Sequence, residues 1–213
     1  MTVMAERRRV DQPATDQPRS PLEALWPAED RPLTVDDLER LPDDGNRYEL
    51  VDGILHVTPS PYNNHQFVVT RLTMILGSWC PIGLDLLGGP GINLASDLHR
   101  IPDLVVVPRM PLESAFVTKP LLLAIEVASR STQQLDRTSK KQDYAAFGIE
   151  SYWIVVTDQD RPSVTAFELR GTKYEQIALA AGDESFEAMR PFPVTLVPSV
   201  LVADGDEWRS LIR

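Results

Sequence analysis

The sequence predicts a mixed α/β fold, in which a mixed β-sheet is flanked by helices, with a β-hairpin near the N-terminus and an antiparallel meander near the C-terminus. Two strongly apolar runs, IPDLVVVP at 101–108 and LLLAIEVAS at 121–129, have the pattern of central strands that are covered on both faces. Helical patterns precede and follow these runs. This order of strand and helix signals is typical of a sheet packed between helices.

The chain is long enough for one domain. It has 213 residues, of which 43% are hydrophobic and 24% are charged, so it can bury one core but is short for two. We therefore expect a single domain over residues 33–213. Residues 1–32 contain five prolines and the run Arg7-Arg8-Arg9, a composition that predicts a disordered tail.

Two helices are expected ahead of the central strands. Thr34 can cap a short helix within residues 33–41, and Asn63 or Asn64 can cap a second helix that runs to about Trp79. Apolar residues of the second helix follow the spacing of one buried stripe. These residues are Val68, Leu72, Ile75, Leu76 and Trp79.

A hairpin is expected at residues 47–57, between the two helices. Its sequence RYELVDGILHV contains the pair Asp52-Gly53, which suits a two-residue type I′ turn. Such a turn would place Glu49 opposite His56 on the paired strands.

The third expected helix and the meander follow the central strands. Ser131 or Thr132 can cap this helix, and Gly148 is a natural residue to end it. After the helix, three strand patterns are joined by short polar turns, which predicts an antiparallel meander. The three strands are expected at 152–158, 163–169 and 173–180.

Composition also restricts the class of function and the compartment. The net charge of −10 argues against a protein that coats nucleic acid through a broad basic face. Residues 117–147 nevertheless carry five basic and three acidic residues, a local charge of +2. Because Cys80 is the single cysteine and no segment has the roughly 18 apolar residues of a membrane span, we expect a cytoplasmic protein without membrane contact.

Asp103 and Glu126 are the strongest candidates for chemistry, because each lies in one of the two central apolar runs. Burying an ionised carboxylate without a partner costs several kcal/mol, so something must compensate Glu126. Its neighbours on the same face of the strand are Ala124 and Ala128, which leave room for an ion. Two carboxylates on central strands suit Mg²⁺ or Mn²⁺.

A purely structural interpretation of these acids stays open. Asp103 could cap the start of a strand after Pro102, and Glu126 could pair with Arg130 or Arg137. The two acids together, with a suitably placed lysine, favour the metal site.

Helix geometry selects that lysine. Consecutive helical residues point about 100° apart, and Lys140 shares its face with Tyr144 and Phe147, whereas Lys141 does not. The aromatic face is expected to pack on the sheet, so Lys140 is expected near the core and Lys141 toward solvent. Lys140 could instead form an i, i+4 pair with Asp136.

Several motifs in order resemble those of the Uma-two family of putative restriction endonucleases, which belongs to the PD-(D/E)xK nuclease-like superfamily. The similar segments include RYELVDGILHV, IPDLVVVP, LLLAIEVAS and DRTSKKQDYAAFGIESYWIV, and the resemblance covers about residues 33–200. It implies a restriction-endonuclease-like sheet with a metal-dependent phosphodiesterase site. Ala128 stands where the superfamily lysine is expected.

The resemblance assigns roles to six residues. Asp103 and Glu126 match the two metal-binding acids, and Lys140 matches a catalytic lysine on the next helix in a D-x-x-x-K-x-x-x-Y pattern that Asp136 and Tyr144 complete. Glu49 matches an acid that could complete the catalytic metal site. His65 and Tyr144 are weaker candidates for contacts with substrate, since His65 could equally cap its helix.

These observations predict a Mg²⁺- or Mn²⁺-dependent endonuclease that hydrolyses phosphodiester bonds, with DNA as the expected substrate. One alternative is a catalytically silent module on a nuclease fold that binds nucleic acid or protein, which the acidic charge favours. A second alternative is a structural homodimer built through the meander.

Overall fold

The computed structural model describes residues 3–4, 31–111, 117, 120–128 and 135–213, and the side chains of residues 3–4 and 135–137 lie outside this description. Contacts group the chain into two compact units. The first unit runs to Ser60 and includes Ile92–Ile101; the second consists of Pro61–Gly91 and Pro102–Arg213. The single domain and the disordered tail stay predictions, the tail because most of it lies outside the described residues.

The first unit is built around a five-stranded antiparallel sheet with strand order β1-β3-β2-β6-β5. Its strands are β1 (Val3–Met4), β2 (Arg47–Val51), β3 (Ile54–Thr58), β5 (Ile92–Ala95) and β6 (Leu98–Arg100). The predicted hairpin is confirmed, because Glu49 lies opposite His56 and both Asp52 (φ 50°) and Gly53 (φ 74°) have the left-handed backbone of a type I′ turn.

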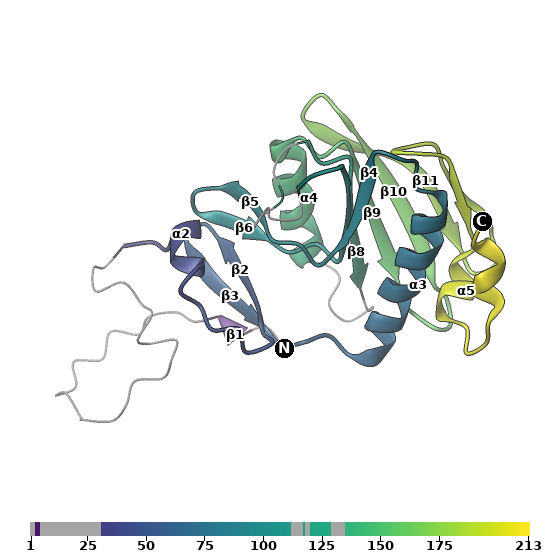
Figure 1. Ribbon diagram of the computed structural model, residues 1–213, viewed down its shortest axis with the longest axis horizontal. Helices are drawn as coiled ribbons and strands as arrows, with labels where there is room; N and C mark the ends of the chain where they lie inside the picture. The colour runs from purple at the N-terminus through teal and green to yellow at the C-terminus, as the bar shows by residue number, and fades with distance from the viewer. Residues whose placement is uncertain (1–2, 5–30, 112–116, 118–119, 129–134) are drawn as a thin grey trace. The chain divides into compact units, whose positions relative to one another are not determined.

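The second unit contains a six-stranded mixed sheet with order β11-β10-β9-β8-β7-β4 (Figure 1). Its strands are β4 (Leu84–Gly88), β7 (Leu104–Pro108), β8 (Leu123–Ala128), β9 (Ser151–Val156), β10 (Ser163–Arg170) and β11 (Lys173–Ala181). β8 and β9 run parallel, and the other neighbours run antiparallel. The predicted central strands and the meander of β9, β10 and β11 are therefore confirmed.

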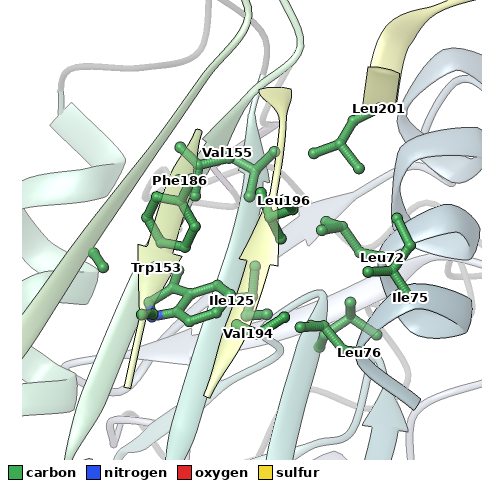
Figure 2. Close-up of a cluster of buried hydrophobic side chains, with 14 of the residues drawn as sticks. Leu72, Ile75, Leu76, Ile125, Trp153, Val155, Phe186, Val194, Leu196 and Leu201 are labelled. Carbon is green, nitrogen blue, oxygen red and sulfur yellow. The ribbon is translucent and has the colours of Figure 1, made fainter. Parts of the chain in front are cut away.

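Helix α3 (Asn63–Trp79) covers one face of this sheet. The predicted stripe is confirmed for Val68, Leu72, Ile75 and Leu76, which are buried, whereas Trp79 is only partly buried and packs against the same core. They pack in one core with β8, β9, the small sheet of β12 (Phe186–Ala188) and β13 (Val194–Leu196), and helix α5 (Pro198–Val202) (Figure 2). A 3-10 helix, η2 (Glu207–Leu211), adds Trp208 to the same core.

The predicted cap of α3 is wrong. Tyr62 is the N-cap residue, and its side chain makes no capping hydrogen bond within the described residues. Asn64 instead accepts a hydrogen bond from the backbone N–H of His65 through Oδ1 at 2.8 Å. The asparagines therefore predicted the correct start of α3, although neither of them is its N-cap residue.

Helix α4 (Leu135–Phe147) contacts the other face of the sheet. Successive residues of a strand point to opposite faces, so Ile125 and Val127, which belong to the α3 core, point away from Glu126. Glu126 is hydrogen-bonded by Tyr144 of α4. α4 ends before Gly148 (φ 91°), as predicted, whereas the expected caps at Ser131 and Thr132 lie outside the described residues.

The first turn of α2 (Val35–Leu38) is held by one carboxylate. Asp37 accepts two hydrogen bonds from the Arg31 guanidinium, at 2.8 and 2.9 Å, and one from the backbone N–H of Thr34 at 2.8 Å. The hydrogen bonds from Arg31 hold the pKa of Asp37 well below its ordinary value. Because the folded pKa is depressed, this contribution to stability is present above the unfolded pKa of about 3.9 and is lost as the pH falls toward the folded pKa.

We expect Asp37→Asn to lower the free energy of unfolding by about 1 kcal/mol at pH 7, as loss of a helix cap does. The difference from wild type should shrink as the pH falls below about 4, because the Asp37 carboxylate then binds a proton in the unfolded chain while it stays ionised in the fold. Urea unfolding over this pH range measures both effects. Asp36→Asn is the matched control, because Asp36 is an exposed acid of the same turn; equal effects of the two variants would contradict the assignment.

Candidate functional site: two acids and a lysine

Glu126 lies near the C-terminal end of β8, with its side chain 12% exposed. Three hydrogen bonds from α4 reach its carboxylate. The Lys140 Nζ donates to both oxygens at 3.2 Å, and the Tyr144 hydroxyl donates to Oε1 at 2.6 Å. A buried acid is tolerated where its charge is paired and its oxygens are hydrogen-bonded. Lys140 and Tyr144 therefore compensate the carboxylate of Glu126 in its apolar strand.

The spacing of α4 brings these two donors together. Residues four apart lie one above the other on a helix face, so Lys140 and Tyr144 both point at β8. Lys140 is 7% exposed and Tyr144 is fully buried, which confirms the expected core-facing position of Lys140. Lys141 departs from the expectation, because its Nζ lies 3.6 Å from the centre of the Phe167 ring and burial lowers its pKa.

Asp103 directly precedes β7 and is 5% exposed. Its Oδ2 accepts a hydrogen bond from the backbone N–H of Val127 at 2.8 Å, so its carboxylate is joined to the residue that follows Glu126. The structural role considered for Asp103 is therefore real, but it is a bond between strands and not a cap of its own strand. It also holds the acid beside the end of β8.

His65 contacts the same carboxylate from the first turn of α3. Its Nε2 lies 3.1 Å from Asp103 Oδ2. A carboxylate accepts hydrogen bonds, so Nε2 carries the proton in this contact. The Nδ1 atom is buried and has no hydrogen-bond partner within the described residues. The sequence pattern suggested a cap or a contact with substrate and missed this contact with Asp103.

Glu49 belongs to the first unit, on β2. Its Oε2 lies 3.2 Å from Arg100 Nη1, and its Oε1 accepts the backbone N–H of Ile101 at 3.0 Å. Arg100 is 3% exposed, so the pair is a buried ion pair within that unit. The structure thus shows a structural role for Glu49, and its role as a metal ligand stays a prediction.

The donor chemistry of Asp103 and Glu126 fits a hard divalent cation. Mg²⁺ is commonly held by one or two carboxylates and completes its shell with water and substrate phosphate. Within the described part of the chain, no group of three or more His, Cys, Asp or Glu side chains gathers to hold a metal.

Three alternative partners considered for Glu126 and Lys140 stay predictions. Arg130 and the side chains of Asp136 and Arg137 lie outside the described residues. The hydrogen bond from Tyr144 to Glu126 was missed, since Tyr144 was predicted as a substrate contact. A signal for it was present, because a tyrosine four residues after a core-facing lysine must point at the same strand.

The mixed sheet with a helix on each face is a nuclease-like fold. The Uma2 family, described as "Putative restriction endonuclease", matches residues 35–201. The chain belongs to this family, as its motifs predicted.

A solved structure has the same fold. It is described as a putative nuclease belonging to DUF820 from Anabaena variabilis, and it superposes with a TM-score of 0.63 at 18% sequence identity. The match covers 80% of this chain and 98% of that chain. No curated protein sequence matches the chain. None of the described helices is long and apolar enough to cross a membrane.

We expect Tyr144→Phe to lower the free energy of unfolding by about 2 kcal/mol, because it removes a hydrogen bond to a charged, largely buried carboxylate. Tyr174→Phe is the matched control, since the Tyr174 hydroxyl donates to the neutral carbonyl of Ile149 at 2.8 Å, a bond worth about 1 kcal/mol. Chemical denaturation of both variants compares them. A loss no larger for Tyr144→Phe than for Tyr174→Phe would count against an ionised Glu126.

We expect Lys140→Met to lower the free energy of unfolding by about 3 kcal/mol, because it leaves the carboxylate of Glu126 without its cation. Adding Glu126→Gln to this variant should restore part of the loss. Lys141→Met should cost about 1 kcal/mol or less, the value of a cation–π contact. Denaturation of these three variants and of Glu126→Gln alone forms the test, and additive effects of Lys140→Met and Glu126→Gln would show that the two residues do not interact.

Proposed function

We propose that the protein is a Mg²⁺- or Mn²⁺-dependent endonuclease that hydrolyses phosphodiester bonds, with DNA as its expected substrate. The observation that carries the proposal is the contact of Lys140 with both oxygens of Glu126, beside Asp103 on the neighbouring strand. Membership of a family described as "Putative restriction endonuclease" supports the same reaction class.

Asp103 and Glu126 would hold the metal. When bound, such an ion polarises the phosphate and helps to stabilise the leaving oxygen. Tyr144 would keep the carboxylate of Glu126 oriented through its 2.6 Å hydrogen bond. The contact of His65 with Asp103 Oδ2 would restrict the orientation of the second carboxylate in the same way.

Lys140 would act on the substrate and the attacking water. Its ammonium group has three donors and reaches oxygen atoms at the acid site, so it can hold a water by a hydrogen bond. A fixed positive charge at this place would also offset the negative charge that grows on the phosphate in the transition state. Glu49 as a third ligand and Tyr144 as a substrate contact remain part of the proposal.

A catalytically silent binding module on the same fold is the second candidate. The net charge of −10 favours it, because proteins that bind nucleic acid through phosphate contacts usually carry a basic face. A cytoplasmic location and a homodimer also remain proposals. Cleavage of nucleic acid by the purified protein separates the two candidates.

We expect cleavage of DNA to need added Mg²⁺ or Mn²⁺ and to be lost in Asp103→Asn and in Lys140→Ala. Mn²⁺ should stabilise the wild type by about 2.7 kcal/mol at a concentration one hundred times its dissociation constant, and should stabilise Asp103→Asn much less. Nuclease assays on DNA and RNA, together with thermal denaturation at several metal concentrations, give the two readouts.

Asp85→Asn is the control for this experiment, because Asp85 is a carboxylate of β4 that pairs with Arg109 at 3.5 Å. It should retain both cleavage and stabilisation by metal. Absence of metal-dependent cleavage by wild type, with no stabilisation by Mn²⁺, would favour the silent binding module.

A further inference from the structure

A pocket of about 330 Å³ lies within the second unit, on the side of the sheet that α3 covers. One wall is a single face of α3, because Asn64, Phe67, Val68 and Arg71 follow the helical spacing of three and four residues. The opposite walls come from the segment after β9 and from the chain at the end of α5. These residues are Thr157, Gln159, Leu201, Val202, Ala203 and Asp204.

Two backbone connections link the lining of this pocket to the acid site. Asn64 directly precedes His65, whose ring contacts Asp103. On the other side, the backbone N–H of Thr157 donates to the carbonyl of Ala128 at 3.1 Å, and Ala128 lies two residues after Glu126. The pocket therefore adjoins His65, the residue of α3 that contacts Asp103.

The lining combines an exposed aromatic ring with polar groups. Phe67 is 64% exposed, so its side chain is accessible to a ligand in the pocket that it lines. The amides of Asn64 and Gln159 offer both donors and acceptors, and the Asp204 carboxylate accepts hydrogen bonds. An aromatic face with hydrogen-bonding groups around it matches a nucleobase, which has a flat ring and polar edges.

Arg71 gives the pocket a fixed wall. Its Nη1 donates to the carbonyls of Leu201 and Ala203 at 2.9 and 2.7 Å, and its guanidinium lies 5.7 Å from the centre of the Trp208 ring. These contacts tie α3 to the end of α5. The pocket is therefore framed by residues that are already held in place, which lowers the entropy lost when a ligand binds.

We propose that this pocket holds one unpaired base of a single-stranded nucleic acid whose backbone passes the acid site, with the base stacked on Phe67. The volume lies at the small end of the range for ligand pockets, roughly 300–1,000 Å³, and suits one ring system. Stacking also explains how an acidic protein would hold this substrate, because it needs no basic face. The inference rests on the proposed function only for the class of substrate.

The test measures binding separately from cleavage. Fluorescence anisotropy follows short labelled DNA and RNA single strands and the duplex of the same sequence, with EDTA present so that nothing is cut. The variants are Phe67→Ala and Phe67→Leu, of which the second keeps an apolar side chain but removes the aromatic face. Ile82→Ala is the control, because Ile82 is a 98% exposed apolar residue of the same unit that does not line the pocket.

We expect the single strand to bind more tightly than the duplex, and both Phe67 variants to lose about tenfold in affinity for it, as removal of one stacking partner does. Ile82→Ala should bind like wild type. The preference for DNA or RNA identifies the source of the base. Wild-type affinity in Phe67→Ala, an equal or greater affinity for duplex, or no binding of either nucleic acid would each overturn the inference.

Cleavage of the same strands with Mg²⁺ keeps this inference separate from the proposed function. Cleavage combined with binding that does not depend on Phe67 would overturn the base pocket and leave the endonuclease standing. Binding that depends on Phe67, without cleavage under any metal, would support the pocket and contradict the endonuclease.

Discussion

The buried carboxylate of Glu126 is the constraint around which the second unit is arranged. An acid in the middle of a sheet needs a cation and a hydrogen-bond donor close by, and α4 supplies both from positions four residues apart, through Lys140 and Tyr144. The helix must therefore pack on the face of β8 that Glu126 occupies, while α3 and the apolar core take the other face. The buried charge of Glu126 therefore determines which helix packs on this face of the sheet, how that helix is positioned over β8, and where the candidate site lies.

The same arrangement explains how the fold can keep a lysine at the site although Ala128 occupies the strand position expected for it. A side chain on a neighbouring helix can reach the same oxygens as one on the strand, provided that the helix lies directly over them. The 3.2 Å contacts of Lys140 with both Glu126 oxygens meet this condition. Ala128 then leaves space beside the acid, where a lysine would otherwise stand on the strand.

Much of this could be predicted from the sequence, because the relevant patterns are local. The periodicity of α3, the Asp52-Gly53 turn and the core-facing position of Lys140 each follow from spacing within a few residues. Contacts between distant segments could not be predicted in this way. His65 meets Asp103 across 38 residues, and Arg71 reaches the carbonyls at the end of α5 across about 130. Such contacts depend on how helices and strands pack against one another, and the spacing of residues along the sequence does not determine that packing.

The acidic composition and the proposed substrate are compatible once two sources of affinity are separated. Contacts with phosphate depend on charge and weaken with salt, and a net charge of −10 offers little long-range attraction to a duplex. Stacking of an unpaired base depends on an accessible ring and is available to an acidic protein. With Phe67 exposed in its pocket on α3, the chain would select its substrate by accessible bases first and use the positive charge of Lys140 locally. A protein of this kind would be expected to act where strands are already open.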